Sequence, residues 1–123
     1  MALKILVVDD AAFIRELLIQ ICQTQNWQVV GEARDGQEAV TLAKSLKPDV
    51  VIMDLIMPEK NGIDATKEIL AENPTSKIIA CSTVDETNLV MRALDAGCSN
   101  YIVKPFENNK VIEVINSAMG DKK

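Results

Sequence analysis

The stretch DVVIMDLIMP, residues 49–58, decides the fold of this chain. Its apolar run from Val50 to Met53 has no polar break, which is typical of a strand covered on both faces inside a parallel sheet. Asp54 follows at the carboxyl end of that strand, and Pro58 prevents regular pairing from continuing. Ligands of open α/β sheets bind at this end of the strands. A single aspartate there more often begins a turn, so the other strand ends must decide whether Asp54 is functional.

The composition describes an ordinary folded domain without a concentrated basic surface. The 123 residues match the usual size of one domain, and 48% are hydrophobic while 25% are charged. Eighteen acidic and 13 basic residues give a net charge of −5, and no element carries a Lys/Arg cluster. We therefore expect no direct binding of nucleic acid, which requires a basic face. The apolar runs are also too short to span a bilayer, so no membrane association or signal peptide is expected.

Three cysteines and the absence of histidine argue against a zinc site and a disulfide framework. Cys22, Cys81 and Cys98 are odd in number and lack CxxC spacing. Buried, reduced thiols in a cytoplasmic protein fit this pattern better.

Apolar runs and helical periodicities alternate along the whole chain and predict five strand–helix units. Strands are expected at residues 5–8, 28–33, 50–54, 77–82 and 101–103. Helices are expected from 12 to about 25, from 36 until Pro48 closes the segment, from a cap at Asn61 to 73, from a cap at Asp85 to Gly97, and from 108 to 119. In the first helix the 3.6-residue period places Phe13, Ile14, Leu17, Leu18, Ile21 and Cys22 toward the core.

Regular alternation of strands and helices predicts a parallel sheet with right-handed crossovers and helices on both faces. The first and third strands are the most apolar and should be central, whereas the second, QVVGEA, is more polar and should lie at an edge. The order 2-1-3-4-5, which is that of flavodoxin-like folds, satisfies these conditions. Asp9, Asp10 and Asp54 would then meet at the switch point between strands one and three.

Three carboxylates in one crevice need positive charge. At about 4 Å each pair repels by roughly 4 kcal/mol at an effective dielectric near 20, and a helix N-terminus offsets only about 0.3–1 kcal/mol. Mg²⁺, which takes oxygen ligands and is usually shared with a phosphate, is the natural counterion. Lys104 and Ser82 would bring an ammonium and a hydroxyl to the same edge. This combination favours phosphoryl transfer with a carboxylate as nucleophile.

Each of these residues also has a structural interpretation. Asp10 alone would be a helix N-cap, Lys104 a surface lysine, Ser82 a turn hydroxyl and Tyr101 an edge-strand packing residue. Those separate interpretations do not explain why all of them fall at carboxyl ends of strands in one sheet. The functional interpretation is therefore favoured.

Four motifs carry a resemblance to a known family: VVDDAAFIR (7–15), DVVIMDLIMPEKNGIDA (49–65), KIIACST (77–83) and YIVKPF (101–106). Together they resemble the receiver domain of two-component response regulators, most closely single-domain chemotaxis regulators of the CheY type. The resemblance covers essentially the whole chain. It implies that Asp54 accepts a phosphoryl group from the phosphohistidine of a histidine kinase.

The same resemblance implies the roles of the surrounding residues. Mg²⁺ would be held by Asp10, Asp54 and the backbone carbonyl of Ile56, with Asp9 often acting through water. Ser82 and Lys104 would hold the phosphoryl oxygens, Tyr101 would be an aromatic switch, and the Lys104–Pro105 bond would be cis.

The resemblance further implies a monomeric phosphoacceptor that is not an enzyme in the usual sense but assists its own phosphorylation and dephosphorylation. Its partners would be a histidine kinase or phosphotransfer protein and an output protein, such as a flagellar motor switch, bound by the fourth helix, fifth strand and fifth helix. We expect residues 1–123 to be one receiver domain, and the short polar tail after Met119 favours a complete protein.

Three positions depart from the best-known chemotaxis pattern. Leu55 replaces a tryptophan after the acceptor, so that the only tryptophan is Trp27, before the second strand on the opposite side. Ile56 and Val84 are apolar where some relatives carry polar groups. These two changes leave the lifetime of the phosphoryl group open.

Three other interpretations of the sequence compete with a single receiver domain. A dehalogenase-type phosphatase would need DxDxT after the first strand, where this chain has DDAAF, and an FMN carrier would not place two aspartates beside a phosphate. The chain could also be the receiver part of a larger regulator.

Overall fold

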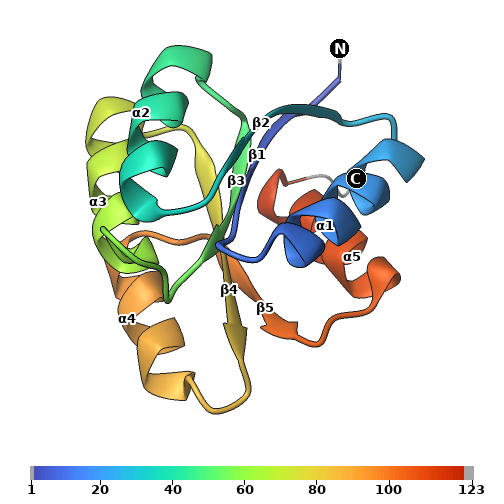
Figure 1. The fold of residues 1–123 in the computed structure, drawn as a ribbon. Helices are drawn as coiled ribbons and strands as arrows, with labels where there is room; N and C mark the ends of the chain where they lie inside the picture. Colours follow the sequence, from blue (N-terminus) through green and yellow to red (C-terminus); the bar gives the residue numbers. More distant parts are fainter. Residues whose placement is uncertain (1, 121–123) are drawn as a thin grey trace.

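The computed structural model describes residues 2–120, and they form one parallel sheet between two layers of helices (Figure 1). The strands are β1 (Lys4–Val8), β2 (Gln28–Ala33), β3 (Val50–Asp54), β4 (Lys77–Thr83) and β5 (Asn100–Lys104). The helices are α1 (Ala12–Thr24), α2 (Gly36–Leu46), α3 (Gly62–Glu72), α4 (Thr87–Ala96) and α5 (Asn108–Ala118).

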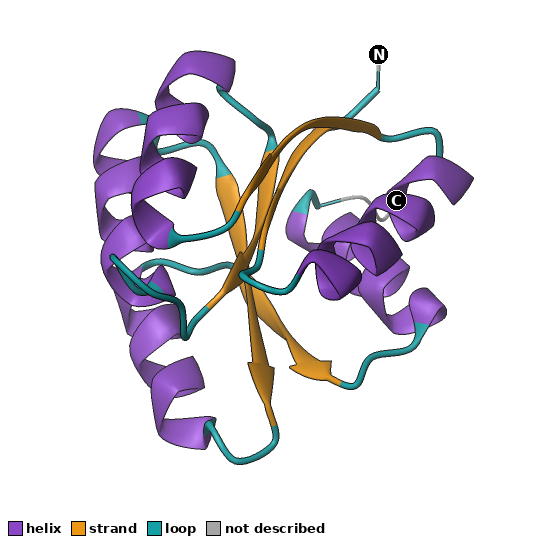
Figure 2. Ribbon diagram, in the orientation of Figure 1, coloured by secondary structure: helices purple, strands orange, loops and turns teal. Residues whose placement is uncertain are grey.

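The strand order is β2-β1-β3-β4-β5 and every pairing is parallel, which confirms the predicted doubly wound topology. Helices α2, α3 and α4 cover one face of the sheet, and α1 and α5 cover the other (Figures 1 and 2). Because all strands run the same way, their carboxyl ends lie at one edge, and the loops that leave this edge carry the candidate residues.

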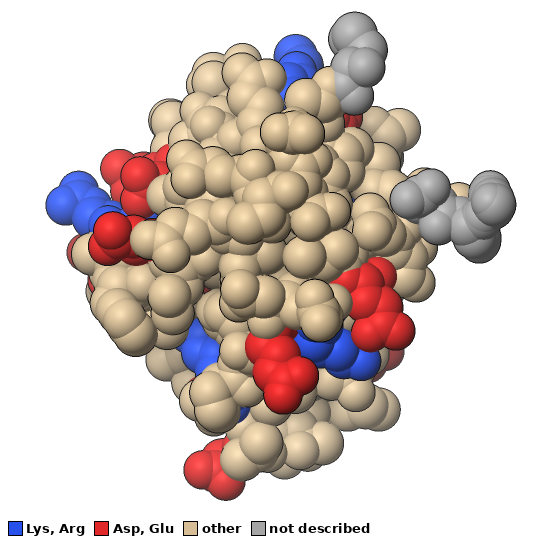
Figure 3. Space-filling model, turned by 90° about the vertical axis from the view of Figure 1, so that its right-hand side faces the viewer, with Lys and Arg blue, Asp and Glu red and all other residues tan. Residues whose placement is uncertain are grey.

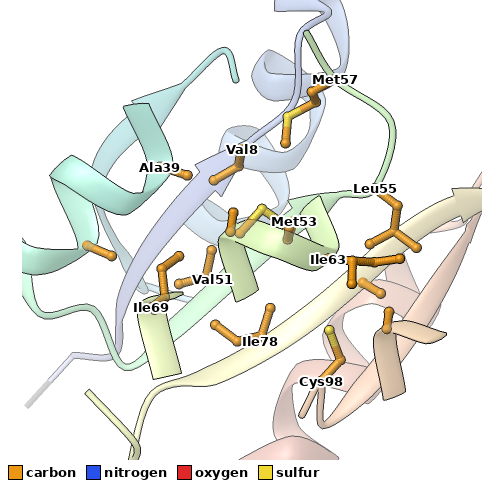
Figure 4. Close-up of a cluster of buried hydrophobic side chains, with 14 of the residues drawn as sticks. Val8, Ala39, Val51, Met53, Leu55, Met57, Ile63, Ile69, Ile78 and Cys98 are labelled. Atoms are coloured by element: carbon orange, nitrogen blue, oxygen red, sulfur yellow. The ribbon is translucent and has the colours of Figure 1, made fainter. Parts of the chain in front are cut away.

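The sheet separates two apolar clusters. Strand side chains alternate between the faces, so each strand contributes to both. The cluster under α2, α3 and α4 includes Val8, Val51, Met53, Ile69 and Ile78 (Figure 4). The cluster under α1 and α5 includes Ile5, Val7, Ile52, Ile79 and Ile115. Residues 50–54 are all buried, which explains why their sequence shows no polar alternation.

Two glycines allow the loop between β3 and α3 to close tightly against its neighbours. The amide of Gly62 donates to the carbonyl of Leu55 at 3.0 Å, and that of Gly36 donates to the carbonyl of Lys60 at 2.9 Å. A Cβ on Gly62 would lie 2.2 Å from the carbonyl oxygen of Asp54, and one on Gly36 would lie 2.0 Å from that of Lys60. Any larger residue at either position would displace the loop that follows Asp54.

The predicted caps are partly confirmed. Asn61 accepts from the amide of Asp64 at 2.8 Å, and Gly97 ends α4 with a φ of 119°. Asp85 is not the cap of α4, because the chain makes one more turn and Glu86 occupies that position. The Glu86 carboxylate instead accepts from the amide of Thr83 at 2.9 Å.

Phe13 is the one predicted core residue of α1 that the structure places in solvent, with 69% of its surface exposed. Burial on this helix is complete only at Leu18, Ile21 and Cys22. The first turn of α1 leaves the carboxyl edge of the sheet, where little of the sheet remains to cover it. Helical periodicity identifies the apolar face of a helix. It does not indicate how far along the helix the sheet extends to cover that face.

The three cysteines are buried and free, as expected. Burial raises the pKa of Cys22 and Cys98 to about 11 and that of Cys81 to about 12, so all three thiols remain protonated near neutral pH.

The side of the molecule formed by α1 and α5 shows acidic and basic groups interspersed around a broad uncharged area (Figure 3). Within residues 2–120, no helix combines the length and apolar character needed to cross a membrane.

Candidate functional site

The carboxyl edge of the sheet brings three aspartates together. Asp9 and Asp10 follow β1, and Asp54 ends the neighbouring strand β3. One carboxylate oxygen from each lies within 4.8 Å of the other two. Asp9 and Asp54 are buried whereas Asp10 is exposed, so the cluster has a closed side and a side open to solvent. The predicted meeting of these residues is confirmed.

Lys104, at the end of β5, reaches across the cluster. Its Nζ donates to Oδ2 of Asp9 at 2.8 Å and lies 3.5 Å from Oδ1 of Asp54. Burial alone would lower the pKa of Lys104, but the hydrogen bond that it donates to Asp9 and the charges of Asp54 and Asp9 outweigh this effect. The pKa of Lys104 therefore lies above its usual value, and the ammonium stays charged.

The two consecutive aspartates have different roles at the start of α1. Oδ1 of Asp9 accepts from the amide of Ala11 at 2.9 Å, while Ala11 itself occupies the N-cap position and provides no capping side chain. Asp10 is therefore not the N-cap. Among residues 2–120 the carboxylate of Asp10 has no hydrogen-bond partner, which leaves its oxygens available to a ligand.

The surroundings of Asp54 disfavour the ionised form of its carboxyl group. Burial raises its pKa to about 6, and the negative charges of Asp9 and Asp10 act in the same direction. Lys104 and the backbone N–H of Ile56 lower it only in part. One lysine is therefore insufficient to compensate three carboxylates, and the site favours binding of a further cation.

Ser82 is the one polar side chain within the described residues that is buried without a hydrogen-bond partner. It lies in β4, next to Cys81, which is paired with Asp54. Only 1% of Ser82 is exposed. A buried hydroxyl without a partner costs about 1–3 kcal/mol, and Ser82 is therefore a donor available to a ligand oxygen at this edge of the sheet.

The donor set fits Mg²⁺, since this ion prefers hard oxygen ligands and octahedral coordination with retained waters. The cluster offers carboxylate oxygens on a buried floor and, at Asp10, on the open side. It offers no nitrogen or sulfur ligand that would favour zinc.

Tyr101 lies on β5 beside a cavity between α4, β4 and β5. The cavity has a volume of about 430 Å³ and is lined in part by Ser82, Val84, Met91 and Leu94. The Tyr101 side chain is 42% exposed. The cavity thus connects the hydroxyl beside the aspartates with an aromatic ring on the surface.

The structure also has a site residue that the sequence analysis did not single out. Arg15, in α1, donates from Nη1 to the backbone carbonyl of Asp9 at 2.8 Å. The signal was present in VVDDAAFIR, where a basic residue lies on the sheet-facing side of the helix that follows the two aspartates. The Lys104–Pro105 bond is cis, as the resemblance implied.

Comparison with known proteins identifies the class to which this fold and site belong. The response regulator receiver domain matches residues 5–116, and the chain belongs to that family, the receiver domains of two-component response regulators. Receiver domains are signalling phosphoacceptors, and they bind Mg²⁺ at an acidic pocket.

Among individual proteins, the chain resembles CheY. It is 48% identical over 116 residues to the chemotaxis protein CheY of Thermotoga maritima, covering 94% of this chain and 97% of that protein. The response regulator domain of Thermotoga maritima CheB superposes with a TM-score of 0.88 at 36% identity over the full length of both chains. CheY in a complex with CheX, BeF3 and Mg²⁺ from Borrelia burgdorferi superposes with a TM-score of 0.90 at 30% identity, covering 95% of this chain and 89% of that one.

Proposed function

We propose that this receiver domain is a Mg²⁺-dependent cytoplasmic switch whose Asp54 accepts a phosphoryl group from the phosphohistidine of a histidine kinase or phosphotransfer protein. The observation that carries the proposal is the position of Lys104, which contacts both Asp9 and Asp54 at the open edge of the sheet. The nearby Ser82 hydroxyl, which has no partner among the described residues, supplies independent support.

In the proposed reaction a carboxylate oxygen of Asp54 attacks phosphorus while the phosphorus–nitrogen bond of the donor histidine breaks. The donor ring leaves with the electron pair of the broken bond on its nitrogen and, because it is protonated on its other nitrogen, departs as neutral imidazole; the other product is an acyl phosphate on Asp54. Lys104 would exchange its contact with Asp54 for a phosphoryl oxygen, and Ser82 would donate its free O–H to another. The ammonium of Lys104 already lies 3.5 Å from Oδ1 of Asp54, so little reorganisation of the lysine is required.

Asp10, Asp54 and the backbone carbonyl of Ile56 are the residues that would hold Mg²⁺. Asp9 would act through water, since its two oxygens are engaged by Ala11 and Lys104. The bound ion would supply charge neutralisation for the phosphoryl oxygens.

Phosphorylation would shift the balance between two conformations of the protein. When Ser82 turns toward the phosphoryl group, Tyr101 would move inward into the adjoining cavity, as a switch. The exposed apolar residues Met91, Leu94 and Tyr101 lie on α4 and β5, which supports an output surface formed by α4, β5 and α5. A flagellar motor switch protein is the partner class that similarity to CheY favours.

We further propose that residues 1–123 form a single receiver domain, monomeric, that assists its own phosphorylation and dephosphorylation but has no other enzymatic activity. No observation in the structure favours the phosphatase alternative.

The test is phosphorylation of the purified protein by acetyl phosphate or phosphoramidate with Mg²⁺, followed by intact-mass analysis. One phosphoryl group is expected on the parent protein, and none on Asp54→Asn, because an amide is not a nucleophile here. Asp95→Asn, an exposed aspartate of α4, is the matched control and should be labelled like the parent. An adduct that persists on Asp54→Asn would show that another residue is the acceptor.

Phosphotransfer from a panel of histidine kinases identifies the kinase partner. Pull-down with phosphorylated and with unphosphorylated protein then identifies the output protein. Selective capture by the phosphorylated form is expected. Equal capture by both forms of the protein would contradict the proposed switch.

A further inference from the structure

The guanidinium of Arg15 connects three elements at the back of the acidic cluster. Its Nη1 donates to the backbone carbonyl of Asp9 at 2.8 Å, and its Nε donates to Oε1 of Glu32 at 2.9 Å. Arg15 lies in α1, Asp9 follows β1, and Glu32 lies in β2. Only 13% of the Arg15 side chain is exposed, whereas 49% of the Glu32 side chain is, so the guanidinium is largely enclosed although its carboxylate partner reaches solvent.

The carbonyl that Arg15 holds belongs to the peptide unit between Asp9 and Asp10. The ladder between β1 and β2 ends one residue earlier, at the pair Val8 and Ala33, so this carbonyl lies beyond the regular strand pairing. The other polar groups of Asp9 are also fixed: its amide donates to Ala33, and its carboxylate is bound by Ala11 and Lys104. Together with these contacts, the hydrogen bond from Arg15 fixes the position of the Asp9–Asp10 peptide, and therefore the backbone of Asp10.

Asp10 depends on that backbone anchor. Its side chain is exposed and has no hydrogen-bond partner among residues 2–120, so its own contacts do not hold it over the cluster. The orientation of its carboxylate toward Asp9 and Asp54 therefore follows from the path of the chain through the Asp9–Asp10 peptide. A residue that fixes that peptide acts on Asp10 without touching it.

We infer that Arg15 is a positioning residue for divalent-cation binding: it clamps the Asp9–Asp10 peptide to β2 so that the Asp10 carboxylate is already directed at the ion. The inference rests on the proposed function insofar as the ion is Mg²⁺. Glu32 orients the guanidinium and neutralises its charge, so Arg15 acts through geometry and not by adding positive charge to the site. Residues that support a ligand in this way commonly alter metal affinity by about 10–100-fold.

Lysine is the informative replacement. It keeps the charge of Arg15 but has one ammonium group on a flexible stem, and it does not reproduce the planar fork that contacts Asp9 and Glu32 together. Arg15→Lys and Arg15→Met should therefore both weaken Mg²⁺ binding, by about tenfold in Kd. Glu32→Gln preserves an acceptor for Nε and the bond to Asp9 but no longer neutralises the guanidinium, so its Kd should rise by less than in either Arg15 variant. Arg92→Met, at an exposed arginine of α4, is the matched control and should not change Kd.

The measurement is isothermal titration of each unphosphorylated variant with MgCl₂ at constant ionic strength, with circular dichroism and thermal unfolding to establish that each is folded. A second readout is the Mg²⁺ dependence of phosphorylation by phosphoramidate. The Mg²⁺ concentration at half-maximal rate should rise about tenfold in Arg15→Lys and Arg15→Met, while the rate at saturating Mg²⁺ stays within about twofold, because Asp54, Lys104 and Ser82 are unchanged.

Parent-like affinity in Arg15→Lys with loss only in Arg15→Met would show that a single ammonium donor suffices and that the guanidinium fork is not required, and would overturn the inference, as would parent-like affinity in both. An equal loss in Glu32→Gln would also overturn it. Failure of the parent protein to bind Mg²⁺ or to be phosphorylated on Asp54 would instead refute the proposed function, so the two failures are distinguishable.

Discussion

Lys104 and Asp9 are separated by 95 positions in the sequence, yet Nζ of the lysine donates to Oδ2 of the aspartate at 2.8 Å. The contact exists because β1 and β5 end at the same edge of the sheet. It leaves Lys104 charged and 3.5 Å from Asp54, the proposed acceptor, while the buried Asp9 carboxylate has a charged partner.

The ion pair between Lys104 and Asp9 should stabilise the metal-free protein. Lys104→Met leaves Asp9, only 1% exposed, with an unpaired buried charge and should lower the free energy of unfolding by about 2–3 kcal/mol. Asp9→Asn with Lys104→Met should lose less than the sum of the two single variants, with a coupling of about 1–2 kcal/mol. Urea unfolding of the four proteins in EDTA measures this cycle, and strict additivity would show that the pair has no energetic coupling.

The pH dependence of stability should report Asp54. Its folded pKa of about 6 lies above the ordinary value of 3.8, so between these values the native state retains a proton that the unfolded chain has lost. Without metal, the free energy of unfolding should therefore decrease as pH rises through this window, by up to about 1.4 kcal/mol per pH unit from this group. Asp54→Asn should flatten the dependence and be more stable than the parent at pH 7. Urea titrations in EDTA at pH 4.5, 5.5 and 6.5 test this, and an unchanged slope would contradict it.

Asp10→Ala should reduce Mg²⁺ affinity without destabilising the metal-free fold. Because Ala11 occupies the N-cap position and Asp9 binds its amide, the substitution removes like-charge repulsion but no helix cap. Calorimetry should show a larger loss than the roughly tenfold expected for a residue that only supports a ligand. Unchanged affinity would exclude Asp10 as a ligand.

Tryptophan fluorescence should distinguish the two edges of the sheet. Trp27 lines a small pocket with Ala2 and Leu3, before β1 and β2 begin, and should respond little to Mg²⁺ or phosphorylation. Ile56 is 55% exposed beside Asp54, so Ile56→Trp should respond to both, whereas Leu55 is fully buried and would be overpacked by tryptophan. A large Mg²⁺-dependent change from Trp27 in the parent protein would argue against this placement.

The phosphoryl group on Asp54 should turn over slowly. Hydrolysis needs a water aligned with the acyl phosphate, and the exposed side chains of Ile56 and Val84 offer it no hydrogen bond. Ile56→Asn and Val84→Glu should each accelerate dephosphorylation, by about tenfold for each orienting contact worth 1.4 kcal/mol. Decay of the phosphoprotein in excess Mg²⁺, after removal of the donor, gives the rates. Loss within seconds in the parent, with no change in either variant, would refute this explanation.

Most of the fold was accessible from the sequence because burial on both faces imposes uninterrupted apolar runs. The strands containing Val7 and Ile52 could be placed at the centre for that reason, and the chain direction then put Asp9 and Asp54 at one edge. Contacts between side chains were harder to predict from the sequence. Which of the two aspartates after β1 takes the helix amide, and which stays exposed, depends on how the backbone leaves the strand.

Arg15 and Phe13 show the same limit on one helix. Both are near the beginning of α1, where the period predicts an inward position for Phe13 and places Arg15 in line with Leu18 and Cys22, without indicating what its guanidinium contacts. The structure exposes the phenyl ring and leaves only 13% of the Arg15 side chain exposed, because the nearby groups are a strand-end carbonyl and Glu32. Polar groups at the rim of the sheet, which the sequence does not locate, decide the outcome.

Because the sheet divides the apolar interior into two clusters, substitutions in one cluster need not be compensated in the other. Ile69 and Ile115 belong to clusters on opposite sides of β3 and β4, and among residues 2–120 no side chain is shared between the clusters. Distant substitutions without common partners act additively on stability. The packing beneath α4 can therefore change while α1 and α5 keep their fit on the other face of the sheet, so that substitutions in the two halves of the core can accumulate independently of one another.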